Sequence, residues 1–111
     1  MTKIVINACY GGFSLSLSAT KWLASHGCEE AIKELAEMSE TYNSDEFNGF
    51  RPRMARHDAL LVECVETLGE AANGDYAKLV VVTTKSNRYR IVEYDGAEDV
   101  QTPESIKWVT V

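Results

Sequence analysis

The sequence has little of what would identify a function directly. None of its apolar stretches approaches the roughly 18 residues that cross a bilayer, so we expect no membrane span. Its first residues lack the long apolar segment of a signal peptide, which predicts a cytosolic protein with reduced thiols. The three cysteines, Cys9, Cys28 and Cys64, form no CxxC pair, which argues against a disulfide scaffold and a zinc knuckle.

Cofactor and metal motifs are equally scarce. Two histidines, His26 and His57, do not make a metal site by themselves, and the many carboxylates fall on predicted helix faces. Gly11 and Gly12 match the spacing of neither a Walker loop nor a dinucleotide-binding fingerprint. We therefore expect neither a bound metal nor an organic cofactor.

What is present is the composition of one ordinary globular domain spanning residues 1–111. Apolar residues make up 45% of the chain and charged residues 25%. A net charge of −6 disfavours DNA, RNA or an anionic membrane as a partner. Against this acidic background, residues 51–56 carry three arginines and residues 76–92 carry four cations, with no acid in either segment. Compact basic segments of this kind suit a pocket for a small anion.

Hydrophobic periodicity predicts three helices, one ending near His26, one over residues 28–40 and one over residues 58–72. Ser14, Ser16 and Ser18 are N-cap candidates for the first helix, and Asp58 is the candidate for the third. Gly27 is the natural end of the first helix.

Strand signals predict the rest of the fold. Residues 3–8 contain a continuous β-branched run, which is typical of a strand covered on both faces. Residues 77–84 read as a second strand with residues 88–95 as its hairpin partner, and residues 106–111 read as a short last strand. The fold class is therefore α+β, a mainly antiparallel sheet of three to four strands with two to three helices packed on it, on one face.

Residues 41–56 form the longest irregular stretch, and they carry Phe47 and Phe50 besides the three arginines. Aromatic rings interleaved with guanidinium groups suit a ligand made of a base and a phosphate, over which this loop could close. The alternative is a solvated loop pinned by its two phenylalanines.

Two further constellations have both a chemical and a structural interpretation. The Gly11–Gly12 pair, between a strand and a helix, could present N–H groups to an anion or could form a tight turn. Cys9 could be a nucleophile with His57 or His26 as its base, or a core cysteine.

The predicted strand over residues 88–95 places Arg88, Arg90 and Tyr94 on one face. Two guanidinium groups on one face repel each other unless an anion, or an acid such as Glu93 or Glu98, lies between them. The segment from Tyr94 onward is either a plain turn or an aromatic ring and a carboxylate at the edge of a pocket.

Several blocks of the chain resemble a widespread family of small bacteriophage proteins. They are the opening KIVIN, CYGGF and LS over residues 3–16, the RHD and LVE blocks over 56–63, ETLGE and ANG over 66–74, and EYDG with Glu98. The family is similar to the phage Thoeris anti-defence sponge proteins. That resemblance implies a homo-oligomer in the host cytoplasm. It implies that the protein sequesters a cyclic ADP-ribose isomer or a cyclic oligonucleotide without cleaving it.

The resemblance implies ligand contacts at Phe13 and Arg56, with the segment from Tyr94 to Gly96 nearby, and charge adds Arg88 and Arg90. The full set of predicted ligand-binding residues is Tyr10, Gly11, Gly12, Phe13, Arg56, Arg88, Arg90, Tyr94, Asp95 and Lys107. The chain departs from the family at Ala59, where proline is usual, and in its tail, where Lys107 and Trp108 replace an arginine-bearing segment. Lysine cannot reproduce the bidentate contact of arginine.

Two other functions fit the residues. An acidic phage inhibitor could dock on a host protein through the Glu-rich second helix, with Glu34 and Glu37 in contact. A thiol-dependent hydrolase could use Cys9. The leading hypothesis is a non-enzymatic protein that captures a small anionic nucleotide.

Overall fold

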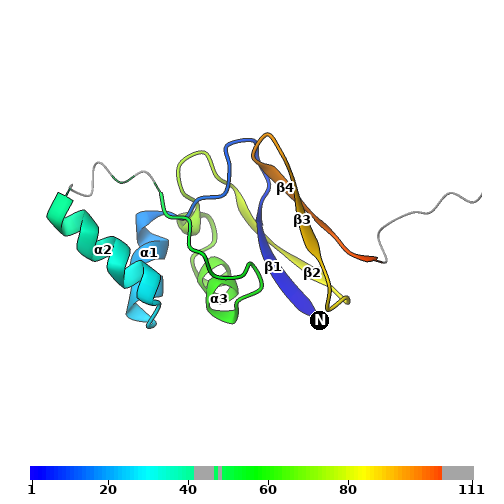
Figure 1. Ribbon diagram of the computed structural model, residues 1–111, viewed down its shortest axis with the longest axis horizontal. Helices are drawn as coiled ribbons and strands as arrows, with labels where there is room; N and C mark the ends of the chain where they lie inside the picture. The colour runs from blue at the N-terminus through cyan, green and yellow to red at the C-terminus, as the bar shows by residue number, and fades with distance from the viewer. Residues whose placement is uncertain (42–46, 48, 104–111) are drawn as a thin grey trace, which may run out of the picture.

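A computed structural model describes residues 1–41, 47 and 49–103 of the chain. Within this part it contains three α-helices and four antiparallel strands, an α+β fold as the sequence predicts (Figure 1). The elements in order are β1 (Thr2–Asn7), α1 (Leu17–Ser25), α2 (Glu29–Thr41), α3 (Ala59–Leu68), the 3₁₀ turn η2 (Gly69–Ala72), β2 (Leu79–Thr84), β3 (Arg90–Tyr94) and β4 (Ala97–Gln101).

The strands pair differently from the sequence prediction. β2 does not form a hairpin with β3: it pairs antiparallel with β1, and β3 pairs with β4, so the four strands form two two-stranded sheets. The hairpin turn lies instead at Asp95 and Gly96, which both have positive φ, at 52° and 91°. An Asp-Gly pair is the strongest local hairpin signal, because the turn that matches strand twist needs that geometry.

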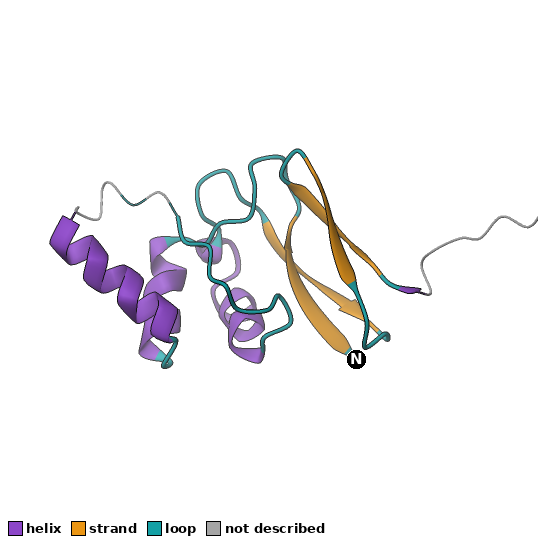
Figure 2. Cartoon of the chain, in the orientation of Figure 1, coloured by secondary structure: helices purple, strands orange, loops and turns teal. Residues whose placement is uncertain are grey.

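The two sheets lie side by side, and the helices lie on one side of them (Figures 1 and 2). β1 and β2 pack on α3, while β4 approaches β1 on the side away from the helices. β1 is covered on both faces as predicted, because Ile4, Val5, Ile6 and Asn7 are all buried. The main core lies between this sheet and the helices, around Val5, Leu23 and Leu61.

Local capping explains where the helices begin and end. Ser16 is the N-cap of α1, and its hydroxyl accepts a hydrogen bond from the backbone N–H of Ala19 at 3.1 Å. Asp58 caps α3 by accepting from the N–H of Leu60 at 2.9 Å. Gly69, at φ 57°, stops α3 four residues before the predicted end.

Two further expectations concern the C-terminal segment and membrane-spanning helices. The predicted strand over residues 106–111, with Lys107, lies outside the described residues. Among the residues that are described, no helix is long and apolar enough to cross a membrane.

Candidate functional site

Asn7, the last residue of β1, ties three turns together. Its side chain is fully buried. The amide nitrogen donates to the carbonyl oxygens of Cys9 at 2.7 Å and Gly96 at 2.8 Å, and the amide oxygen accepts from the N–H of Lys78 at 2.8 Å. One side chain therefore fixes the turns after β1, before β2 and between β3 and β4.

The same three turns approach too closely for side chains at two glycines. A Cβ atom at Gly11 would collide with the backbone of Tyr76, and one at Gly96 would collide with the carbonyl of Tyr10. Only glycine fits such contacts. We call the surface formed by these turns the tyrosine end, because Tyr10, Tyr76 and Tyr94 are 70%, 85% and 78% exposed there.

Arg56 and Glu98 form a bidentate ion pair that covers the outer edge of β1. The two guanidinium nitrogens of Arg56 lie 2.6 and 2.9 Å from the carboxylate oxygens of Glu98. The Glu98 carboxylate also accepts from the N–H of Asn7 at 2.8 Å. Arg56 exchanges backbone and side-chain hydrogen bonds with Val5, at 2.9 and 3.3 Å. Free backbone groups of an edge strand are thus satisfied by one charged pair.

The Arg56 guanidinium also lies over the ring of Phe13, 3.7 Å from its centroid. The Phe13 side chain is buried, and the side chains of Arg56 and Glu98 are 24% and 5% exposed. Both residues to which the resemblance gives ligand contacts therefore contact other parts of the protein. Their assignment to a ligand remains a prediction, and their structural role is to hold the hairpin to β1.

Arg51 is a cation of the tyrosine end that the prediction did not include. One of its terminal nitrogens lies 2.7 Å from the Cβ position that a side chain at Gly12 would take. Within the described part of the chain its guanidinium has no hydrogen-bond or ion-pair partner. Its place in the basic segment 51–56 was the only sequence signal.

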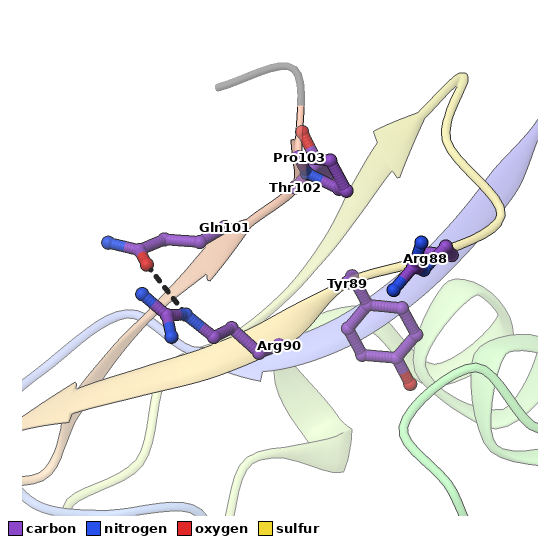
Figure 3. Close-up of a pocket in the computed structure, with 6 residues that line it drawn as sticks. All are labelled: Arg88, Tyr89, Arg90, Gln101, Thr102 and Pro103. Atoms are coloured by element: carbon purple, nitrogen blue, oxygen red, sulfur yellow. Dashed lines mark hydrogen bonds between the residues drawn. The ribbon is translucent and has the colours of Figure 1, made fainter. Parts of the chain in front are cut away.

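Arg88 and Arg90 line a separate hollow of about 290 Å³ at the far end of the hairpin (Figure 3). The other lining residues are Tyr89, Gln101, Thr102 and Pro103. The Nε of Arg90 donates to the side-chain oxygen of Gln101 at 2.9 Å, across the β3–β4 pair. The guanidinium of Arg88 has no partner among the described residues, where its backbone alone contacts Ser86.

The structure therefore divides the predicted ligand-binding residues into two groups. Seven of them, Tyr10, Gly11, Gly12, Phe13, Arg56, Tyr94 and Asp95, lie at or next to the tyrosine end, and Arg88 and Arg90 lie at the hollow. Two consecutive residues link these groups. Arg56 belongs to the first group, and the Nδ1 of the next residue, His57, is 2.7 Å from the hydroxyl of Tyr89 in the hollow. Asn7 and Tyr76 had no recognisable sequence signal, since their roles depend on contacts between distant turns.

The thiol–imidazole pair that a Cys9 hydrolase would need is not formed. The Cys9 thiol donates to the carbonyl of Tyr76 at 2.9 Å, while His26 stacks on Trp22 and His57 bonds to Tyr89. Cys64 is the buried cysteine: burial raises its thiol pKa to about 11, and the neighbouring Cys28 adds to the rise. The described residues contain no group of three His, Cys, Asp or Glu side chains placed to hold a metal ion.

The acidic face of α2 shares a groove with two arginines. Glu30, Glu34 and Glu37 line a groove of about 500 Å³, and Arg51 and Arg53 also line it. The backbone N–H of Arg53 donates to the Glu30 carboxylate at 2.8 Å. The docking of a host protein on this face of α2 remains a prediction.

Comparison with known proteins gives no identification: no protein-family model, no curated protein and no solved structure matches this chain.

Proposed function

We propose that this protein binds a small anionic nucleotide and holds it without cleaving it. We also propose that the protein belongs to the phage sponge family that the sequence resembles. Its ligand is then a cyclic ADP-ribose isomer or a cyclic oligonucleotide. The observation that carries it is the hollow at the end of the hairpin, where two guanidinium groups, with no acidic partner among the described residues, flank a tyrosine ring.

The geometry of Arg90 favours a phosphate. Because its Nε donates to Gln101, the two terminal nitrogens remain available in one plane for a bidentate contact with phosphate oxygens. Arg88 can add a second contact, since no described residue engages its guanidinium. Among the described residues neither guanidinium has an acidic partner, so a bound anion would supply the counter-charge that both lack.

Tyr89 supports binding of the base. Its hydroxyl is held by His57, which limits the motion of the ring and lowers the entropy lost when a base stacks on it. Among the described residues the lining of the hollow includes no Asp, Glu, His or Cys, the side chains that most often act as general base or strong nucleophile. Both features favour capture over hydrolysis.

The test is calorimetric titration with cyclic ADP-ribose isomers and cyclic dinucleotides. We expect Arg88→Ala and Arg90→Ala each to weaken binding by about tenfold or more, because each removes a charge-assisted hydrogen bond. Lys21→Ala is the matched control, an exposed cation on α1 whose loss should leave affinity unchanged. Wild-type affinity in the Arg88/Arg90 double variant would contradict the proposed site.

A second series separates the two groups of predicted residues. Tyr10→Ala and Tyr94→Ala remove exposed rings and should leave the fold intact. If these variants lose affinity and the arginine variants do not, the ligand binds at the tyrosine end. Mass spectrometry of the released ligand then tests sequestration, because recovery of a cleaved product would identify an enzyme.

A further inference from the structure

The outer edge of β2 is bare within the described part of the chain. β2 pairs with β1 alone, in a register that places Val81 opposite Val5 and Leu79 opposite Asn7. Val5 and Asn7 give their N–H groups to Arg56 and Glu98, on the side of β1 away from β2. The Val5–Val81 pair is therefore a non-hydrogen-bonded pair, and the backbone groups of Val81 point away from β1.

The direction of the backbone N–H groups alternates from residue to residue, so the same argument applies to every second residue of β2. Leu79, Val81 and Thr83 all direct their N–H groups to the outer edge. The N–H of Leu79 is already taken, because it donates to the side-chain oxygen of Asn73 at 2.8 Å. Val81 and Thr83 remain as the two outward donors of β2 that have no acceptor among the described residues.

Within the part of the chain that the structure describes, the edge also lacks the usual protection against pairing. Residues 79–84, LVVVTT, include no charged residue and no proline, whereas β3 carries Arg90 and Glu93. Proteins normally place charges, prolines or a covering segment at such an edge, because its open backbone is a template for another strand. The opposite edge of the same sheet, on β1, is covered by the Arg56–Glu98 pair.

We propose that β2 pairs antiparallel with β2 of a second copy of this chain, around a two-fold axis at Val82. In this register Val81 of each copy lies opposite Thr83 of the other, and the two free N–H groups of each copy make four hydrogen bonds. A two-fold axis requires that one surface match itself, and an antiparallel strand pair centred on Val82 does so. This inference does not depend on the proposed ligand.

Charge complementarity supports a second copy as the occupant. A groove of about 530 Å³ runs beside the edge, and its lining includes exposed Glu70 next to Leu79. The proposed register places Lys85 of the second copy opposite Leu79, on the face where Leu79 meets the helices. Its ammonium group can therefore reach Glu70, and the symmetry gives two such pairs.

The register is tested by disulfide trapping. Cα atoms of a non-hydrogen-bonded antiparallel pair are about 4.5 Å apart, within the span of a disulfide, so Val82→Cys should form a covalent dimer on oxidation. Val80→Cys is the matched control on the same face of the strand. In this register the two copies of residue 80 are offset by four residues, about 13 Å, and cannot be bridged. The wild-type chain measures the background from its three native cysteines.

The interface is tested by light scattering after size-exclusion chromatography. The wild type should have twice the chain mass. Val81→Pro should weaken association at least tenfold and shift the protein to a monomer, because proline removes one of the outward N–H groups. Circular dichroism checks that Val81→Pro remains folded, and Thr83→Lys provides a second disrupting change at an exposed position. A monomeric wild type, or a dimer that Val82→Cys does not trap, would overturn the proposal.

Discussion

The two β-ribbons of this protein have opposite characters. In the β1–β2 ribbon, β-branched residues pair with each other, and β1 is buried on both faces. In the β3–β4 hairpin, charged and apolar residues are mixed, and most of β3 is exposed. The first ribbon is shared with the helical core, while the second carries the arginines and the exposed Tyr94.

This difference separates stability from recognition. The apolar ribbon gains its stability from burial against α3, so substitutions there act mainly on folding. The hairpin buries little, and its position depends on a few polar contacts, above all the Arg56–Glu98 pair and the Asn7 amide. Breaking those contacts should therefore disconnect the two ribbons.

Glu98→Ala should have the largest effect. It leaves the largely buried Arg56 guanidinium without its counter-charge and the N–H of Asn7 without an acceptor. Removing one partner of a buried ion pair costs about 3 to 5 kcal/mol of the free energy of unfolding. Urea denaturation monitored by circular dichroism measures this loss. A loss below about 1 kcal/mol would mean that the pair does not hold the hairpin.

Gly96→Ala should cost less, about 2 to 3 kcal/mol, and a matched glycine isolates the reason. Gly96 and Gly27 have nearly the same φ, 91° and 90°, but a Cβ at Gly96 would strike the backbone of Tyr10 while no atom lies within 4 Å at Gly27. Gly27→Ala should therefore cost only the backbone strain, about 1 kcal/mol. Equal thermal unfolding temperatures for the two variants would show that the turns do not pack as described.

The stability of the apolar core can be tested by its dependence on pH. Because the pKa of Cys64 rises from 9.0 in the unfolded chain to about 11 in the folded protein, the folded state retains a proton that the unfolded state loses. The stabilisation is complete below pH 9 and is lost as the pH rises to 11, by about 2 kcal/mol. Urea denaturation between pH 8 and 11 should show this decline. Cys64→Ala should lack that part of the slope, and an identical slope in both proteins would refute the assignment.

Glu66→Gln should have the smallest effect. Its ion pair with Lys3, at 2.9 Å, is about half exposed on both sides, in contrast to the Arg56–Glu98 pair. Exposed pairs contribute about 0 to 1 kcal/mol and are screened by salt. The change in unfolding free energy should be near 0.5 kcal/mol in low salt and smaller in 0.5 M salt. A loss as large as that of Glu98→Ala would remove the distinction between the two pairs.

The sequence was most informative where the signal is local. The caps Ser16 and Asp58, the stop at Gly27 and the buried character of β1 all depend on residues within a few positions of one another. The pairing of residues 77–84 with 88–95 was wrong because it weighed chain proximity above the Asp95–Gly96 turn signal. The gathering of the predicted residues into two groups could not be predicted, since it depends on which turns meet at Asn7.

The sequence by itself determined the α+β class, the three helices and the uneven distribution of charge, because periodicity, capping and composition act over short distances along the chain. Only the tertiary structure decided how the arginines are used. It pairs Arg56 with Glu98, 42 positions along the chain, and leaves Arg51 and Arg88 without partners among the described residues. A guanidinium group has the same charge everywhere in the sequence, and its role depends on whether folding brings a carboxylate within hydrogen-bond distance.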